Sequence, residues 1–197
     1  MATVRSFVAV LLDHALRERL ADAIRELRCH RADVKWVEPG NLHLTLKFLG
    51  PVAEERLPAV EQMVGQVAAA AGAFDLTCRG LGAFPNLRRP RVVWAGVQQG
   101  AKELTELAKG LDARLQELGF QREKRPFSAH VTLGRVKSPI NLHRLTEAVE
   151  GQQEADFGPM RVTAVHLMKS TLTPSGPIYA VVQESALGER NASHSAA

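Results

Sequence analysis

Two short stretches with the same pattern constrain the fold of this chain more than any other feature. Each alternates apolar residues with a histidine and then a threonine, over Leu42–Leu46 and Ala129–Leu133. Side chains in a β-strand alternate between the two faces and rise about 3.3 Å per residue, so each histidine shares a face with its threonine. The apolar positions take the opposite face, where they can be buried. The sequence therefore predicts two half-buried strands, each with a His and a Thr on its open face.

The repeat has two explanations. In the functional one, His43 and Thr45 of the first strand meet His130 and Thr132 of the second at a common site. In the other, two half-buried strands each carry a tolerated histidine, since Thr and apolar residues are both favoured in strands. On average residue usage, two chance matches among the seven histidines are rare, on the order of one in several hundred. We therefore favour the functional explanation.

Composition indicates a folded protein with a mild excess of positive charge. The chain has 197 residues, 45% of them hydrophobic, and a formal net charge of +4, which fits an anionic partner. Cys29 and Cys78 stand outside any CxxC motif or Cys/His cluster, so neither a metal site nor a disulfide framework is predicted. Two scattered thiols fit the reducing cytoplasm, where we expect the protein. No stretch is long and apolar enough to span a membrane.

The spacing of apolar residues and turn signals predicts strands alternating with helices. Strands are expected over residues 4–12, 34–37, 42–49, 74–81, 92–97, 128–136, 161–172 and 178–185. Helices are expected over residues 14–30, 54–71 and 101–118, with a further short helix capped by Asn141. Gly50-Pro51 is expected to end the first motif strand, and the turn Pro174–Pro177 to join the last two strands into a hairpin.

Each half of the chain then contains strands, helices and one motif strand. This predicts an α+β fold with two pseudo-symmetric lobes, each a small β-sheet with helices on its outer face. We expect the motif strands to face each other across a cleft between the sheets, which would bring His43 and His130 together. Residues 1–187 are expected to form this single bilobal domain, and residues 188–197 a disordered tail.

Two imidazoles that face a common point can serve as an acid and a base, because an unperturbed histidine titrates at about pH 6.5. A threonine hydroxyl binds a phosphate oxygen without adding negative charge. The arrangement therefore suits phosphodiester cleavage without a metal: one histidine takes a proton from the attacking water, and the other donates a proton to the leaving oxygen. The residues alone do not decide which histidine does which. A metallohydrolase would need further ligands at metal-binding spacing, and the sequence has none.

The residues around both motifs resemble the two-histidine (2H) phosphoesterases, and within them the RNA 2′,3′-cyclic phosphodiesterase family, also described as 2′-5′ RNA ligases. The resemblance rests on Arg5–Ala9, Trp36-Val37, His43–Gly50, Arg125–Arg135, Tyr179 and Glu184-Ser185. It implies a positively charged cleft and hydrolysis of RNA 2′,3′-cyclic phosphate ends to a 2′-phosphate, without a metal or other cofactor. It implies that His43 is the proton donor to the leaving 3′-oxygen and His130 the proton acceptor from water. The same machinery permits the reverse 2′-5′ ligation.

Other residues near the motifs are candidates for substrate binding. Arg135, just beyond the second motif, is a candidate phosphate ligand beside Thr45 and Thr132, and Arg125 binds phosphate or only caps its loop. Lys47 is expected to share the face of His43 and to line the cleft. Further candidates are Phe48 and Phe127, which can stack on a base although core packing is the commoner fate of such residues, and Arg88, Arg89 and Arg91, which contact an RNA backbone or remain solvated.

Three functional hypotheses remain open at this point. The first is the metal-free phosphodiesterase described above. Its expected partner is RNA with a 2′,3′-cyclic phosphate end or a related cyclic nucleotide, and we expect a monomer that does not bind a membrane. A second hypothesis within the same superfamily is a 2′-5′ oligonucleotide phosphodiesterase or a small cyclic-nucleotide phosphodiesterase. A non-catalytic module that binds RNA ends is the third, and it would bind such ends without turnover.

Overall fold

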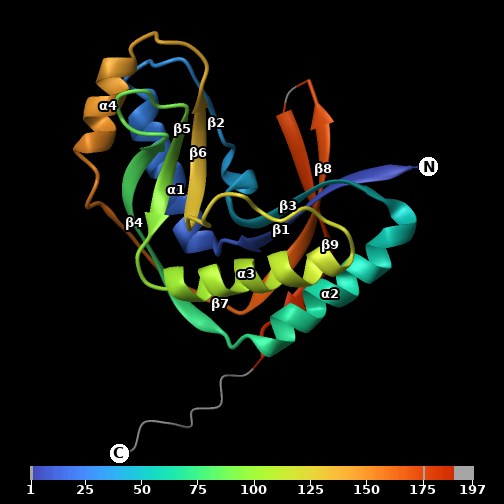
Figure 1. The fold of residues 1–197 in the computed structure, drawn as a ribbon. Coiled ribbons are helices and arrows are strands. Elements are labelled where there is room, and N and C mark those ends of the chain that lie inside the picture. Colours follow the sequence, from blue (N-terminus) through green and yellow to red (C-terminus); the bar gives the residue numbers. More distant parts are fainter. Residues whose placement is uncertain (1, 175, 189–197) are drawn as a thin grey trace, which may run out of the picture.

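Nine stretches form strands in the computed structural model, which describes residues 2–174 and 176–188 (Figure 1). The strands are β1 (Thr3–Leu11), β2 (Val34–Trp36), β3 (His43–Ala53), β4 (Phe74–Phe84), β5 (Val92–Val97), β6 (His130–Val136), β7 (Asp156–Val162), β8 (Ala164–Thr173) and β9 (Gly176–Ala186). The helices are α1 (His14–Arg28), α2 (Leu57–Ala70), α3 (Ala101–Glu117) and α4 (Leu142–Glu150), with 3₁₀ turns η1 (Pro39–Asn41) and η2 (Glu54–Arg56). Ser175 of the expected turn and residues 189–197 of the expected tail lie outside the described residues.

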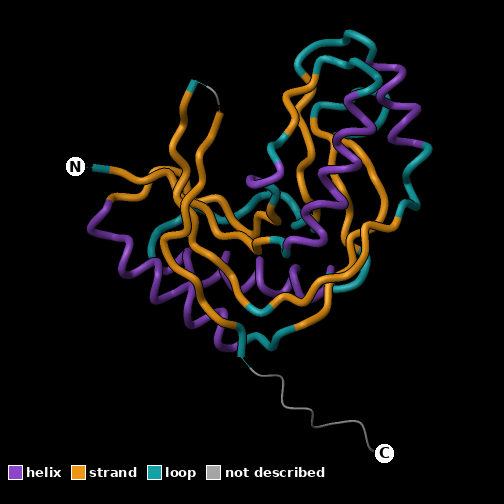
Figure 2. Tube along the Cα trace, turned by 180° about the vertical axis from the view of Figure 1, so that it is seen from behind, coloured by secondary structure: helices purple, strands orange, loops and turns teal. Residues whose placement is uncertain are grey.

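The strands form one antiparallel sheet in the order β7-β4-β5-β6-β3-β1-β8-β9, with β2 paired to β6 outside this path. The motif strands β3 and β6 are neighbours at its centre, where Leu44 pairs with Val131. The sheet is strongly curled, so that the β8–β9 hairpin and the β5–β6 region stand up as two arms (Figure 2). The α+β class is confirmed, and the two expected sheets are joined through this central pair into one.

The helices cover the outer side of the curl. Helices α2 and α3 pack against each other, α2 against β8 and β9 and α3 against β3. Helices α1 and α4 cover the other half of the sheet, where they pack against β7 and β4 (Figure 1). Each half of the sheet therefore combines elements from distant parts of the chain rather than from one half of the sequence. Among the described residues, none of the helices combines the length and the apolar character needed to cross a membrane.

Local sequence accounts for the way these helices begin and pack. The carboxylate of Asp13 accepts a hydrogen bond of 2.7 Å from the Leu16 amide and so caps α1. The apolar stripe of the same helix is buried against the sheet and consists of Leu16, Leu20, Ile24 and Leu27. Burial of each such side chain contributes about 1.5–3 kcal/mol. The hydrophobic core thus lies between the helices and the outer face of the sheet, which leaves the inner face for the motif residues.

Several boundaries differ from the sequence prediction, and two of the differences affect how the strands pair. Strand β3 continues through Gly50-Pro51 to Ala53, because β1 pairs with it along this whole length, including Arg5 with Pro51. Proline has no N–H to donate to a neighbouring strand, but it is tolerated at an edge or a bulge, where not every residue has to donate. The stretch 156–162 is a strand of its own, β7, which pairs with β4 rather than continuing into β8.

Asn141 precedes α4, but its side chain donates to the Arg31 carbonyl instead of capping the helix.

Candidate active site

The two motifs are brought together by the pairing of β3 with β6. Leu44 and Val131 are fully buried and pair across the centre of the sheet. In an antiparallel ladder, extending this register by one residue places His43 beside Thr132 and Thr45 beside His130 on the opposite, inner face. The two histidines are then diagonal neighbours across the two strands, at a separation of about 7–8 Å between their backbone positions. A phosphate group can be contacted from both sides by groups at this separation.

Both histidine rings are held in the same way. The Nδ1 atom of His43 lies 2.7 Å from the Asn41 carbonyl oxygen, and that of His130 lies 2.7 Å from the Ser128 carbonyl oxygen. A carbonyl oxygen only accepts hydrogen bonds, so Nδ1 carries the hydrogen and donates in both rings. The Nε2 atoms are therefore the ones that gain or lose a proton. His43 Nε2 also lies 3.0 Å from the Thr45 hydroxyl oxygen.

A β-bulge follows each threonine. Opposite β1, Thr45 pairs with Ala9 and Lys47 with Val8, so Leu46 is the extra residue. Strand β6 repeats this opposite β5, where Thr132 pairs with Trp94 and Gly134 with Val93, and the extra residue is Leu133. A bulge shifts the alternation of the following residues by one position. The fifth residue after each histidine, Phe48 in β3 and Arg135 in β6, therefore returns to the inner face.

The bulge also explains where Lys47 lies. Its side chain is 2% exposed and is directed to the helix side of the sheet. The Nζ atom donates to Asp112 Oδ1 on α3 at 2.6 Å and to the Gln121 carbonyl oxygen at 2.9 Å. The expectation that Lys47 shares the face of His43 and lines the cleft is wrong, because simple alternation does not continue past Leu46.

Phe48 takes the place expected for Lys47. It is 61% exposed, so core packing, the commoner fate considered for it, does not apply. Phe127 is partly buried and packs against the core. Arg125 is exposed in the loop between α3 and β6, and the arginines at 88, 89 and 91 are exposed in the loop between β4 and β5. Of these residues, Phe48 is the one that the structure brings to the inner face beside the motif.

Aromatic rings support both histidines. The His43 ring lies 4.9 Å from the Phe7 ring and 5.2 Å from the Tyr179 ring. The His130 ring lies 5.0 Å from Phe84, which in turn contacts Trp94 at 5.2 Å. Nothing in the sequence distinguishes Phe84 and Trp94 as site residues, because both stand in apolar runs. Only the pairing of β4 with β5, and of β5 with β6, brings Phe84 to His130 and Trp94 to Phe84, whereas Tyr179 is among the residues of the family resemblance.

The electrostatic environment keeps both histidines less basic than usual. Burial lowers the pKa of His43, the hydrogen bond to the Asn41 carbonyl raises it, and the charge of His130 lowers it further. For His130, burial and the positive charge of Arg135 lower the pKa, against the hydrogen bond to Ser128. The same Arg135 charge acts on Tyr179, whose pKa burial raises. Arg135 therefore lies close enough to influence groups from both halves of the site.

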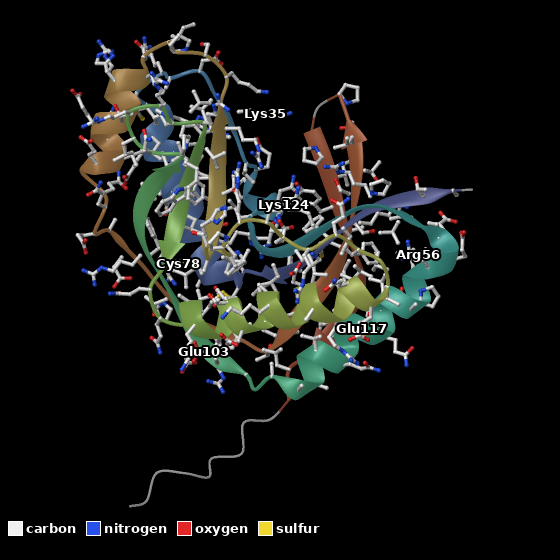
Figure 3. All side chains as sticks on the ribbon, in the orientation of Figure 1. Lys35, Arg56, Cys78, Glu103, Glu117 and Lys124 are labelled. Atoms are coloured by element: carbon white, nitrogen blue, oxygen red, sulfur yellow. The ribbon has the colours of Figure 1, made fainter. Side chains whose placement is uncertain are left out.

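Two further basic residues are Lys35 and Lys124, which are labelled in Figure 3. Lys35 is in β2, opposite Arg135, and its Nζ atom lies 3.8 Å from where a Cβ atom at Gly176 would be. Its side chain thus reaches from β2 to the tip of the β8–β9 hairpin. Among residues 2–174 and 176–188, no group of three His, Cys, Asp or Glu side chains is placed to hold a metal ion.

Comparison with known proteins gives consistent similarities. The family model of the 2′-5′ RNA ligase superfamily matches residues 16–173. The RNA 2′,3′-cyclic phosphodiesterase of Methanothermobacter thermautotrophicus is 43% identical over 176 residues, which cover 89% of this chain and 95% of that protein. The protein of the same name from Aquifex aeolicus is 36% identical over 189 residues, covering 95% and 100%.

Solved structures agree with these matches. A crystal structure of a protein from Thermus thermophilus superposes with a TM-score of 0.80 at 34% identity, covering 94% of this chain and 100% of that one. Escherichia coli LigT in its apo form gives a TM-score of 0.77 at 28% identity, covering 96% and 100%. The same protein has been crystallised with 3′-AMP. With its paired motifs, its curled sheet and these relatives, the chain belongs to the 2′-5′ RNA ligase superfamily.

Proposed function

We propose that this protein hydrolyses the 2′,3′-cyclic phosphate at the end of an RNA to a 2′-phosphate. The observation that carries the proposal is the pair of histidines on one face of the sheet, each with Nδ1 held by a carbonyl oxygen and Nε2 left for proton transfer. Relatives with 36–43% identity over most of this chain carry the name RNA 2′,3′-cyclic phosphodiesterase. The histidines, threonines and Arg135 supply the acid, the base and the phosphate ligands that this reaction needs.

In the proposed reaction, water attacks the phosphorus atom while His130 Nε2 takes its proton. The P–O3′ bond breaks, and protonated His43 Nε2 gives its proton to the departing 3′-oxygen, since an alkoxide is a poor leaving group. The products are a 2′-phosphate and a free 3′-hydroxyl. Replacement of water by the 5′-hydroxyl of a second RNA gives a 2′-5′ phosphodiester by the same steps.

The surroundings of the two histidines support this division of roles. The base must be neutral when water attacks, and the charge of Arg135 favours neutral His130. The acid must be protonated, and the bound phosphate anion stabilises an imidazolium at His43. The Thr45 and Thr132 hydroxyls donate to non-bridging phosphate oxygens, and the Arg135 guanidinium stabilises the negative charge that grows on them.

The context of the site supports three further parts of the proposal. The first and last strands of the described residues, β1 and β9, belong to one continuous sheet, which favours a single domain over residues 1–187. One chain supplies both motifs, so a monomer suffices. Cys29 and Cys78 are both free thiols, which fits a reducing cytoplasm as the location.

A direct test uses a short RNA that ends in a 2′,3′-cyclic phosphate, with the purified protein in excess chelator. The expected product is a 2′-phosphate, formed at a rate that the chelator does not change, and both His43→Ala and His130→Ala abolish its formation. A 3′-phosphate product would mean that the P–O2′ bond breaks, which contradicts the assignment of His43 to the 3′-oxygen. End-specific binding without turnover would refute the enzymatic function.

A further inference from the structure

Asn41, the last residue of the turn η1, makes two contacts that meet at the candidate active site. Its main-chain carbonyl oxygen accepts the hydrogen bond from His43 Nδ1, at 2.7 Å. Its side-chain Nδ2 donates to the carbonyl oxygen of Pro177, near the tip of the β8–β9 hairpin, at 3.1 Å. Asn41 therefore connects the histidine ring to a strand that lies 136 residues further along the chain.

The hairpin returns to the same ring through Tyr179. Pro177 and Tyr179 are two residues apart in β9 and so lie on the same face of the strand. The Tyr179 ring packs edge-on against the His43 ring, with 5.2 Å between the centroids and 87° between the planes. The contacts thus form a closed loop from the Asn41 carbonyl to His43, on to Tyr179 and back through Pro177 to the Asn41 side chain. A shift of the hairpin would disturb both supports of the His43 ring.

Both segments joined by the Asn41 side chain are braced locally. Pro39 begins η1 with a fixed φ, and the Asn41 amide donates to the Glu38 carbonyl oxygen at 2.8 Å. In the hairpin, the Thr173 hydroxyl donates to the Gly176 carbonyl oxygen at 2.6 Å. The bond between Asn41 and Pro177 therefore joins two stiff segments, and the position of one determines the position of the other.

The second motif is built without this connection. Ser128 stands where Asn41 stands in the first motif, two residues before the histidine, and its carbonyl oxygen accepts the hydrogen bond from His130 Nδ1. The Ser128 side chain is exposed and makes no hydrogen bond to any of the residues that the structure describes. The link to a distant strand is thus a property of the first motif.

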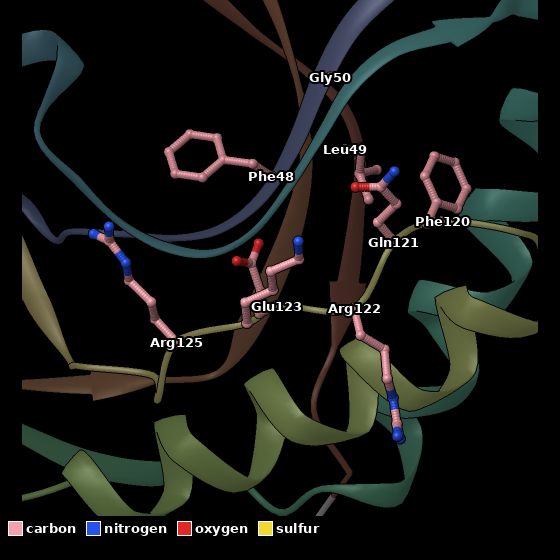
Figure 4. A pocket seen from close by; sticks show the side chains of 9 residues that line it. Phe48, Leu49, Gly50, Phe120, Gln121, Arg122, Glu123 and Arg125 are labelled. Carbon is pink, nitrogen blue, oxygen red and sulfur yellow. The ribbon is translucent and has the colours of Figure 1, made fainter.

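The surroundings of Asn41 favour a role in positioning over contact with a substrate. A pocket of about 600 Å³ lies further along β3, lined by Phe48, Leu49, Gly50 and the segment 120–125 (Figure 4). Asn41 does not line it. The side-chain nitrogen and the main-chain carbonyl oxygen of Asn41 are both engaged with protein groups.

We propose that Asn41 is a positioning residue for His43. Its side-chain amide fixes the β8–β9 hairpin relative to η1, and this arrangement holds the His43 ring with Nε2 directed towards the cyclic phosphate. The inference rests on the proposed function, in which His43 Nε2 protonates the leaving 3′-oxygen. A misplacement of about 1 Å can lower a rate about 100-fold, so loss of the amide should act on kcat rather than on KM.

The kinetic test uses Asn41→Ala, which removes the donor to Pro177 and keeps the main-chain carbonyl. With an RNA that ends in a 2′,3′-cyclic phosphate, kcat should fall by about 10- to 100-fold at nearly unchanged KM. The matched control is Asn141→Ala. Asn141 Nδ2 also donates to a distant carbonyl oxygen, that of Arg31, at 2.9 Å, and the φ of 52° at Asn141 makes alanine strained there. This control should lose at least as much in melting temperature and keep the wild-type kcat.

Nuclear magnetic resonance of the imidazole nitrogens gives a readout that does not depend on turnover. In the wild type, neutral His43 should carry its hydrogen on Nδ1, because the Asn41 carbonyl oxygen accepts it. In Asn41→Ala the fraction with the hydrogen on Nε2 should rise, and the Nδ1 hydrogen should exchange faster with solvent. The tautomer of His130 should stay the same in both proteins, because the Ser128 carbonyl oxygen holds its Nδ1 independently.

A double-mutant cycle on kcat tests whether the effect passes through the hairpin. Tyr179→Leu removes the ring that packs on His43, and Asn41→Ala should then cost less than it does in the wild type. Additive losses of the two variants would show that Asn41 acts on His43 without the hairpin, which contradicts the proposal.

Three other results would overturn the proposal. These are a wild-type kcat in Asn41→Ala, a raised KM at unchanged kcat, which would make Asn41 a substrate ligand, and an unchanged His43 tautomer. Failure of the wild-type protein to hydrolyse the RNA end would refute the proposed function instead, and the tautomer of His43 would still decide whether Asn41 positions the ring.

Discussion

Leu44 in β3 pairs with Val131 in β6, and each of these buried residues stands between the histidine and the threonine of its motif. This pair is the point about which the two halves of the site are related. On either side of it the same features follow: a histidine whose Nδ1 donates to a carbonyl two residues earlier, a threonine, and a bulge. The symmetry ends at the fifth residue after each histidine, where one strand presents Phe48 and the other Arg135.

The charge of Arg135 should be visible in the pH dependence of catalysis. Burial and Arg135 lower the pKa of His130, so Arg135→Gln is expected to raise that pKa. Since the base must be neutral, the acid limb of the kcat/KM profile moves to higher pH in the variant. Arg135→Lys keeps a positive charge and should leave the limb near its wild-type position. An unmoved limb in Arg135→Gln would contradict the role of His130 as the base.

The Thr45 hydroxyl should matter for the rate and little for the fold. It lies 3.0 Å from His43 Nε2, and Thr45→Val keeps the shape of the side chain while removing the oxygen. We expect kcat/KM to fall by about 10- to 100-fold, with the melting temperature nearly unchanged. Thr45→Ser restores the hydroxyl and most of the activity. A fall in the melting temperature that accounts for the lost activity would show that the hydroxyl serves packing instead.

The Lys47–Asp112 pair is expected to stabilise the protein. Lys47→Met leaves the carboxylate of Asp112 without its buried cation, although Arg122 stays 3.7 Å away, and should lower the free energy of unfolding in urea by about 1–3 kcal/mol. Burial raises the pKa of Asp112, but the hydrogen bonds from Lys47 and the Glu123 amide lower it more, so that it lies below its usual value. This group therefore stabilises the fold above about pH 4, and its contribution is lost as the pH falls.

A double-mutant cycle separates the free energy of the Lys47–Asp112 interaction from other destabilising effects of each substitution. Lys47→Met combined with Asp112→Asn should be less destabilised than the sum of the two single variants, because the second change removes the carboxylate that has lost its buried cation. Additive effects would show that the two side chains do not interact. Exchange of the Glu123 amide hydrogen should be faster in Asp112→Asn, since Asp112 accepts its hydrogen bond.

Gly82 is predicted to be required for the ring packing beneath His130. A Cβ atom at this position would lie 2.3 Å from the indole ring of Trp94, which contacts Phe84. Gly82→Ala should therefore cost about 1–3 kcal/mol of stability and lower kcat, because Phe84 contacts His130. Gly65→Ala in α2 is the matched control: its nearest neighbours are 3.9 Å away, and it should gain up to about 1 kcal/mol. Urea unfolding of both variants measures the difference.

The two thiols should differ in reactivity. Burial raises the pKa of Cys78 to about 12, which leaves almost no thiolate at neutral pH, whereas Cys29 is exposed. A thiol reagent should therefore modify one cysteine in the native protein and two in the unfolded protein. Rapid modification of Cys78 under native conditions would show that β4 opens readily. Cys29→Ser provides the control, with no fast reaction in the native state.

Local sequence was sufficient to predict the motif strands, the main helices and the α+β class. The reason is that periodicities of two and 3.6 residues report directly which side chains face a core. The same alternation predicted that His43 and Thr45 share a face, as His130 and Thr132 do. It also predicted the burial of the apolar positions between them, which the structure confirms.

Only the tertiary structure decided which residues complete the inner face. Because of the bulges at Leu46 and Leu133, Phe48 rather than Lys47 lies on the inner face, and Arg135 lies there as well. A bulge depends on the register between a strand and its partner. The pairing of β1 with β3 also carries β3 past Pro51. Chain order likewise did not reveal that α1 covers the far half of the sheet. These features arise from contacts between segments distant in sequence, which a local pattern cannot encode.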